Sequence, residues 1–191
     1  MSALGPGFAD PVTGAQACFR ALLDAMARPG TLREAGAGLT PPAPLDPATA
    51  AVLLTLVDAD TPLWLSDATE ATWPWLAFHC GAVRSGDLGE ATFACALTMP
   101  PLAALSPGSD AEPESSATLI LQVAELGAGS AYTLSGPGLA GPARLAVTGL
   151  PEDFPAQWLA NRALHPRGVD LILCAGERLA ALPRSNRVEG G

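Results

Sequence analysis

The sequence contains no lysine, and all ten of its basic residues are arginines. A Schiff base to pyridoxal phosphate needs a lysine amine, so a chain without lysine cannot hold that aldehyde cofactor covalently. A Walker A loop likewise needs its lysine on the nucleotide phosphates. The missing residue type therefore excludes both chemistries for this chain, and we expect no cofactor.

Histidine and cysteine are also scarce, with two and four residues in 191. The cysteines form no CxxC pair and have no histidine at zinc-ligand spacing, so we expect no metal site. Cys18, Cys95 and Cys174 stand in apolar segments, where a free thiol behaves as a small hydrophobic side chain. We therefore expect reduced thiols in the core of a cytoplasmic protein.

Long apolar runs are absent, and the N-terminal residues have no basic start followed by an apolar stretch. We expect neither a membrane span nor a signal peptide. The formal net charge of -9 has the wrong sign for binding nucleic-acid phosphates, so we expect no nucleic-acid partner. Yet 49% of the residues are hydrophobic and 15% are charged, which favours an apolar surface covered by another chain.

A first helix is predicted between a capping-box pattern at Thr13 and Gln16 and the Pro29-Gly30 pair. A second stripe of this helix carries charges every four residues, which predicts a solvent-facing row of ion pairs. The apolar residues expected to face the core are Phe19, Leu22, Leu23 and Met26, and the charged stripe consists of Arg20, Asp24 and Arg28.

The remaining pattern alternates helices with strands and hairpins. This alternation indicates an α/β fold with a mixed sheet sandwiched by helices, and the absence of repeats or long linkers predicts one domain over residues 1–191. Asp46 and Pro47 mark one helix start. Helices are expected over residues 48–57, around 73–78 with an end near Gly81, and over 153–163. Strands are expected over 63–66, 91–97 and 117–126, on both sides of 136–138 and in a hairpin around 175–177.

Two acid/base pairs can be drawn from the sequence, His165 with Asp170 and His79 with Glu114. A histidine oriented by a carboxylate can act as a general base, but no Gly-x-Ser-x-Gly nucleophile motif accompanies either pair. His79 stands near the expected end of a helix, where a histidine often caps the helix or packs in the core. Catalysis by these pairs would make the chain a free-standing acid/base enzyme.

Six segments, in this order, closely resemble one family, the H subunits (PhnH) of the bacterial carbon-phosphorus lyase system. The similarity extends from Phe8 to Glu189, and six segments in register are far more specific than any single motif. The segments are DPVTGAQACFRALLDAMARPGTL, LTLVDADTPLWLS, FHCGA, LSPGSDAEPESSATLILQV, LSGPGL and RGVDLILCAGERLAALPRSNRVE.

The resemblance implies a role in phosphonate catabolism. Proteins of this family belong to a core complex with the G, I and J subunits, which uses ATP to form alpha-D-ribose 1-methylphosphonate 5-triphosphate. The H subunit is needed for that stage and has no established catalytic role of its own. Family members form homodimers when isolated, and their fold resembles the large domain of pyridoxal-phosphate-dependent transferases. Because this chain lacks lysine, the resemblance implies the inherited fold without its cofactor, in an accessory subunit that is not catalytic alone.

Candidate site residues follow from the family-like segments. A phosphonate or phosphate ligand would need arginine donors, and the candidates are Arg20, Arg167 and Arg184, with ordinary ion pairs as the alternative for each. We expect Arg20→Ala or Arg184→Ala to weaken complex assembly or phosphonate use and to leave the isolated fold intact. The interface or functional candidates are His79, Glu114 and Asp170.

His165 departs from the family pattern, which has an aromatic residue before Pro166, so we expect its ring to pack under a loop. Two functional alternatives stay open beside the accessory subunit. One is the free-standing acid/base enzyme, and the other is a small-molecule-binding protein built on a degenerate cofactor cleft.

Overall fold

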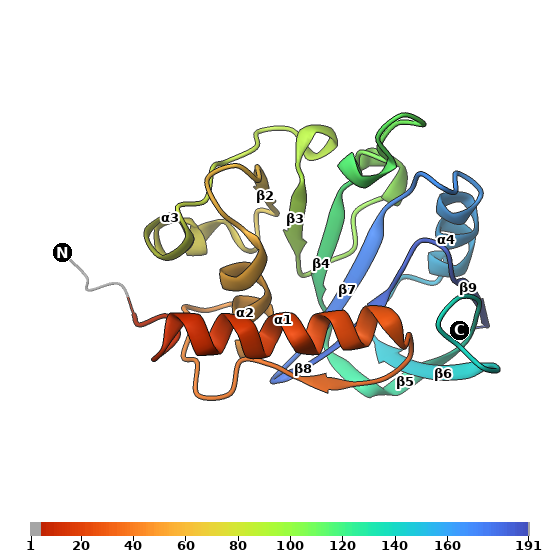
Figure 1. Cartoon of the computed structure of the whole chain (residues 1–191), viewed down its shortest axis with the longest axis horizontal. Coiled ribbons are helices and arrows are strands. Elements are labelled where there is room, and N and C mark those ends of the chain that lie inside the picture. The colour runs from red at the N-terminus through yellow and green to blue at the C-terminus, as the bar shows by residue number, and fades with distance from the viewer. Residues whose placement is uncertain (1–4, 191) are drawn as a thin grey trace.

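Six strands form the main sheet of the structure, a computed structural model that describes residues 5–190. Figure 1 shows its arrangement. The order across the sheet is β1 (Arg33–Glu34), β8 (Arg178–Leu182), β7 (Asp170–Ala175), β4 (Thr118–Gln122), β3 (Phe93–Ala96) and β2 (Leu63–Leu65). The four strands β2, β3, β4 and β7 are parallel, whereas β8 and β1 run antiparallel to their neighbours, which confirms the predicted mixed sheet.

A second, three-stranded antiparallel sheet was not predicted. It has the order β6 (Ala143–Thr148), β5 (Glu125–Ser135) and β9 (Arg187–Gly190). Helices lie on both faces of the main sheet, as predicted, but on one face α4 shares the cover with this second sheet. Strand β9 was missed because its four residues, RVEG, contain a single apolar side chain and give no alternating signal of useful length.

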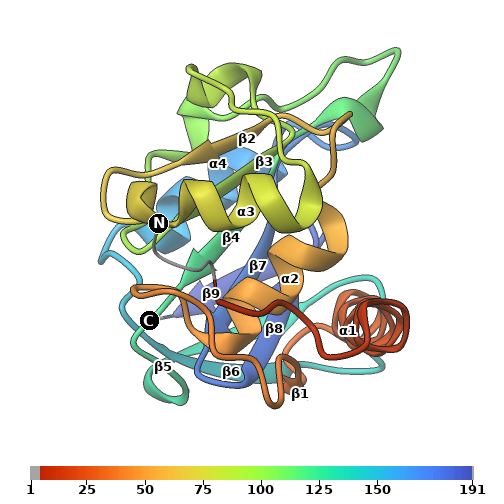
Figure 2. The same cartoon turned by 90° about the vertical axis from the view of Figure 1, so that its left-hand side faces the viewer.

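Two hydrophobic cores lie on opposite faces of the main sheet. One core is formed with α1 (Pro11–Ala27), α2 (Pro47–Leu56) and α3 (Trp73–Cys80), and α2 lies between the other two helices (Figure 2). The other core is formed with α4 (Phe154–Arg162) and the second sheet. Successive residues of β4 point to opposite cores, Ile120 to the first and Leu119 and Leu121 to the second. Both cores therefore depend on the same strands.

The start of α1 differs from the predicted capping box. Asp10 is the N-cap residue, and its Oδ1 accepts hydrogen bonds from the backbone amides of Val12 (3.1 Å) and Thr13 (3.2 Å). The Thr13 hydroxyl donates to Asp10 Oδ2 over 2.8 Å. These donors, first of all the Thr13 side chain, lower the pKa of Asp10 because they stabilise the carboxylate. Thr13 thus belongs to the first turn of the helix.

The orientation of α1 agrees with the prediction only in part. Leu22 is buried together with Cys18 and Ala25, and Met26 packs against the core, whereas Phe19 is 46% exposed and Leu23 is 54% exposed. Two neighbouring stripes of this helix are apolar, and the stripe with the smaller residues is the one that packs on α2 and β8. Of the predicted ion pairs, the structure contains Arg28 with Asp24; the second partner of Asp24 is Arg33 and not Arg20.

Other predicted boundaries are confirmed. Asp46 precedes α2, and Gly81 follows the last residue of α3 with a φ of 64°, the left-handed conformation typical of a residue after a helix. Gly176 and Glu177 form the two-residue turn between β7 and β8, where Ala175 pairs with Arg178. Short 3-10 helices η1 (Glu70–Thr72), η2 (Leu88–Glu90), η3 (Leu102–Ala104) and η4 (Pro113–Ser115) complete the crossovers. Over residues 5–190, no helix combines the length and the apolar character that crossing a membrane requires.

Candidate functional site

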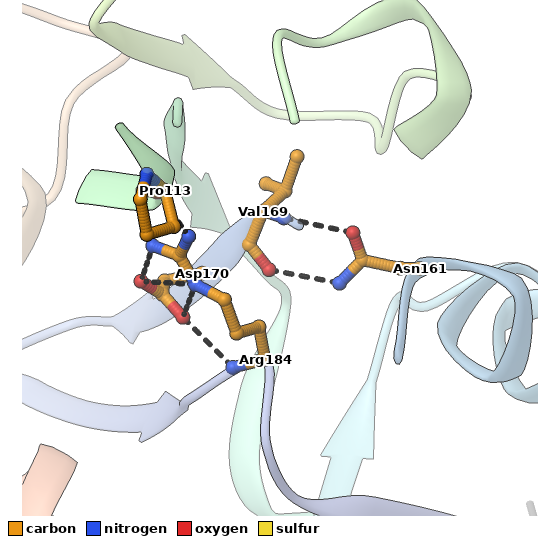
Figure 3. A network of polar contacts seen from close by, with 5 residues as sticks. All are labelled: Pro113, Asn161, Val169, Asp170 and Arg184. Carbon is orange, nitrogen blue, oxygen red and sulfur yellow. Dashed lines mark hydrogen bonds and ion pairs between the residues drawn. The ribbon is translucent and has the colours of Figure 1, made fainter. Parts of the chain in front are cut away.

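Arg184 and Asp170 form a network at the start of β7 and the end of β8 (Figure 3). Arg184 Nε donates to both carboxylate oxygens of Asp170, at 3.1 and 3.2 Å, and its backbone amide donates to Oδ1 at 2.7 Å. Its Nη1 donates to the Pro113 carbonyl at 2.7 Å. The two side chains are 16% and 18% exposed. These contacts occupy the guanidinium fork, so Arg184 ties η4 to the β7–β8 hairpin.

Asn161 extends this network from α4. Its Nδ2 donates to the Val169 carbonyl over 2.9 Å, and its Oδ1 accepts from the Val169 amide over 2.8 Å (Figure 3). The pair of hydrogen bonds fixes the end of α4 to the residue before β7. Sequence reasoning missed Asn161, although its place seven residues after the buried Phe154, on the same helix face, marks it as a polar residue facing the core.

The other two candidate arginines lie elsewhere. Arg167 Nε is 2.9 Å from Asp110 Oδ1, and this ion pair between a half-buried arginine and an exposed aspartate joins the residues before β7 to the loop 106–116. Arg20 is exposed on α1 and has no ion pair with any residue of 5–190. The three arginines therefore do not converge on one anion site. Arg20 lies on α1, whereas Arg167 precedes β7 and Arg184 follows β8.

His79 contacts the N-terminal segment instead of a carboxylate. Its Nε2 is 2.9 Å from the Gly5 carbonyl, which also accepts a hydrogen bond from Trp75 Nε1 over 3.0 Å. The ring packs beside Trp75 and edge-on to Phe78, with centroid distances of 4.9 and 5.0 Å. Glu114 is exposed in η4 and makes no ion pair within the described residues. The proposed pair of His79 with Glu114 is not formed.

His165 is exposed, so the expectation that its ring packs under a loop is wrong. Asp170 does not orient this histidine, because the Asp170 carboxylate accepts hydrogen bonds from three donor groups of Arg184. His165 precedes Pro166 across a cis peptide bond in the turn that follows α4. Neither acid/base pair drawn from the sequence is therefore assembled in the structure.

The cysteines confirm the prediction of core residues. Cys18, Cys95 and Cys174 are buried, and all four thiols are free. Burial raises the pKa of the Cys95 thiol from 9.0 to about 12 and raises that of Cys174 well above 9.0. A buried thiol with a raised pKa stays protonated at neutral pH and is a poor nucleophile. Residues 5–190 contain no cluster of three or more His, Cys, Asp or Glu side chains suited to a metal ion.

The carboxyl ends of β4 and β7 are sealed by the chain itself. Ligands of open α/β sheets bind outside the carboxyl ends of the strands. Here Gln122, the last residue of β4, accepts a hydrogen bond from the Asp46 amide at 2.7 Å and donates one to the Pro44 carbonyl at 2.8 Å. Asp46 Oδ2 in turn accepts from the Gly176 amide after β7, at 2.8 Å. The segment before α2 therefore occupies the place where a ligand would contact these strands.

Two hollows flank α4 on the surface. One, of about 550 Å³, lies between η3 and α4, and its lining includes Leu102, Leu105, Ala160 and Leu164. The other, of about 520 Å³, lies between α4 and β9. The polar Gln157 in the first hollow is already satisfied, since it accepts from the Leu102 amide at 2.9 Å and donates to Asp153 at 3.0 Å. We call the outer side of α4 with these two hollows the α4 surface.

Comparisons with known proteins agree over almost the whole chain. The model of the family described as bacterial phosphonate metabolism protein (PhnH) matches residues 6–189. A protein of Rhizobium meliloti (strain 1021), named alpha-D-ribose 1-methylphosphonate 5-triphosphate synthase subunit PhnH, is 42% identical over 187 residues, which are 95% of this chain and 94% of the relative. A putative C-P lyase subunit protein HtxG of Stutzerimonas stutzeri is 37% identical over 81 residues, 42% of each chain. Both relatives bear the names of subunits.

Proposed function

The chain belongs to the PhnH family of bacterial phosphonate metabolism proteins, and from this membership we propose that it is an accessory subunit of a carbon-phosphorus lyase core complex. In this role it is required for the ATP-dependent formation of alpha-D-ribose 1-methylphosphonate 5-triphosphate and is not catalytic alone. Its partners are the G, I and J subunits, and the isolated chain forms a homodimer. Residues 1–191 act as one domain.

The observation that carries the proposal is the identity of 42% over 95% of the chain with a protein named as a subunit of the synthase. The chemistry of the candidate residues supports a non-catalytic role. Asp170 and Arg184 are engaged with each other, and the two histidines lie apart from Asp170 and Glu114. The chain thus offers surfaces to its partners instead of an assembled set of acid/base groups.

The scaffold itself is the second part of the proposal. A mixed sheet with parallel central strands and three helices on one face is compatible with the large domain of pyridoxal-phosphate-dependent transferases. The absence of lysine removes the covalent anchor of the coenzyme, and Asp46 and Gln122 close the carboxyl ends of β4 and β7. We infer that the fold is retained as a frame for assembly.

Among the arginines, Arg20 and Arg167 stay candidates for contact with an anion or a partner. Arg20 is exposed and Arg167 is half-buried. The ion pair of Arg167 with the 84%-exposed Asp110 contributes little free energy, so a partner's carboxylate or an anion can replace Asp110. Glu114 is an exposed interface candidate on η4. Through the contacts described above, three other candidates stabilise the fold, namely Arg184, Asp170 and His79. The four free thiols are compatible with a reducing compartment, which supports the cytoplasmic location that we propose.

The test is reconstitution with sister subunits from the same genome. Co-expression with the tagged G, I and J subunits should give stoichiometric co-purification of this chain. Deletion of its gene should abolish formation of the triphosphate and growth on methylphosphonate as the sole phosphorus source. Formation of the triphosphate by the G, I and J subunits without this chain would contradict the proposal, as would robust turnover by the purified chain alone.

A further inference from the structure

The α4 surface combines an apolar ridge with two hollows. Phe154 and Trp158 face the core, but Leu159, near the middle of the helix, is 66% exposed, and Leu164 just after it is 38% exposed. The ridge is continued by the exposed Ala156 and Ala160. Covering a leucine that has two thirds of its surface in water is favourable, because apolar area is removed from water.

The hollow between α4 and β9 adds positive charge to this apolar ridge. Arg162 and Arg187 both line it, and neither has an ion pair with any residue of 5–190. Glu189 is the single carboxylate in the lining. In a chain with a net charge of -9, two guanidinium groups beside one carboxylate form a locally positive groove. Such a groove is complementary to carboxylates on the surface that covers it.

The arrangement favours a protein over a small molecule. The hollows lie on opposite flanks of the same helix. Leu159 lines the hollow beside β9, whereas Ala160 and Leu164 line the hollow beside η3, so a small ligand in one hollow would leave the other flank in water. In the hollow beside η3, the amides of Gln157 and Asn161 are bound within the chain, which leaves few polar groups to orient a small ligand.

A second copy of this chain fits the α4 surface less well. A symmetric contact between two copies uses the same patch on both sides. Centred on α4, it would bring Arg162 and Arg187 to the interface twice, with only two copies of Glu189 to balance them. Unpaired like charges at an interface oppose association.

We propose that the α4 surface is the docking site for a sister subunit of the complex, one that presents an apolar ridge and acidic side chains. The apolar ridge of the partner covers Leu159 and enters the hollow beside η3, and its carboxylates bind Arg162 and Arg187. This inference rests on the function proposed above and assigns one surface of the chain to assembly with a different polypeptide.

The experiment uses two matched leucine variants in the co-expressed complex. Leu159→Glu places a charge on the α4 surface, and Leu23→Glu makes the same change at the similarly exposed position on α1. With the tag on a sister subunit, we expect the recovery of Leu159→Glu to fall at least about tenfold relative to the wild-type chain, as for a residue at the centre of an interface. Leu23→Glu should be recovered like the wild-type chain. Both isolated variants should keep the wild-type thermal unfolding temperature, because neither residue is buried.

A second pair of variants tests the charge. Arg187→Gln should weaken recovery and make it less sensitive to salt, whereas Arg144→Gln, an exposed arginine on β6, should change neither. The mass of the isolated chain in solution should be the same for Leu159→Glu and the wild type.

Recovery of Leu159→Glu equal to that of the wild type would overturn the inference and leave the proposed function standing. Equal losses for Leu159→Glu and Leu23→Glu would also overturn it. Loss of self-association in Leu159→Glu, with assembly intact, would assign the surface to a second copy. Failure of the wild-type chain to co-purify would instead contradict the proposed function and the inference together.

Discussion

Arg184 shows how a residue selected as a ligand contact can turn out to hold the fold. Nothing in the sequence distinguishes an arginine that awaits a phosphate from one paired with Asp170, fourteen positions earlier. The pairing depends on the β7–β8 hairpin, which brings the first residue of β7 close to the second residue after β8. The candidate set could therefore be predicted by residue type, but the role of each member required the register of the strands.

Arg184→Ala should lower the free energy of unfolding by about 2–3 kcal/mol, because the 18%-exposed carboxylate of Asp170 would lose its charged partner and the Pro113 carbonyl its donor. Urea unfolding monitored by circular dichroism measures this change. Arg20→Ala is the matched control, since Arg20 is exposed, and it should stay within about 0.5 kcal/mol of the wild type. This outcome replaces the expectation that both substitutions leave the isolated fold intact. Equal stabilities of the two variants would show that the network contributes nothing.

At the scale of the element, the sequence predicted α1 but only part of its buried side, since Leu22 and Met26 face the core and Phe19 and Leu23 do not. A helical period identifies an apolar face only when the remaining faces are polar. In α1, the stripe with Phe19 and Leu23 competes with the stripe with Cys18, Leu22 and Ala25. Packing against α2 and β8 decides between them, and that information lies in other segments of the chain. In α4, by contrast, Phe154 and Trp158 define one face clearly.

The junction between α4 and β7 depends on a single amide side chain. Asn161→Ala should destabilise the chain by about 2–3 kcal/mol, because it leaves the buried amide and carbonyl groups of Val169 without partners. Leu159→Ala on the same helix should cost less than about 1 kcal/mol, since Leu159 is mostly exposed. Urea midpoints of the two variants make the comparison. A loss in Leu159→Ala as large as that in Asn161→Ala would show that α4 is held by its outer side.

Amide hydrogen exchange distinguishes this local tie from a general loss of packing. In Asn161→Ala, the Val169 amide should lose its protection from exchange. Amides in the centre of β4, such as that of Ile120, should exchange only through global unfolding, so that their protection should fall no further than the lower free energy of unfolding of the variant requires. Unchanged protection at Val169 would contradict the role assigned to Asn161.

At the scale of the whole molecule, the sequence predicted the α/β class and the mixed sheet but not the second sheet. The central strands are near-continuous apolar runs because both their faces are covered, as the segment TLILQ of β4 shows. Such a run predicts burial on both faces and does not say whether a helix or a sheet provides the cover. The long hairpin β5–β6 could be predicted as two strands, but its pairing with β9 brings together residues more than fifty positions apart.

The shared strands make the two cores one cooperative unit. Trp75 lies in the first core and Trp158 in the second, and both side chains are nearly fully buried. Because β4 and β7 supply side chains to both cores, the loss of one core removes support from the strands that carry the other. We therefore expect the two cores to unfold together.

Two single-tryptophan variants report on each core by fluorescence. One retains Trp75 and the other retains Trp158, and in each variant the other three tryptophans are replaced by phenylalanine. In each variant, the urea transition of the single tryptophan should coincide with the transition seen by far-ultraviolet circular dichroism, as required of a two-state protein. A fluorescence transition that precedes the circular dichroism transition in one variant only would show that the main sheet persists after one of its faces has been uncovered.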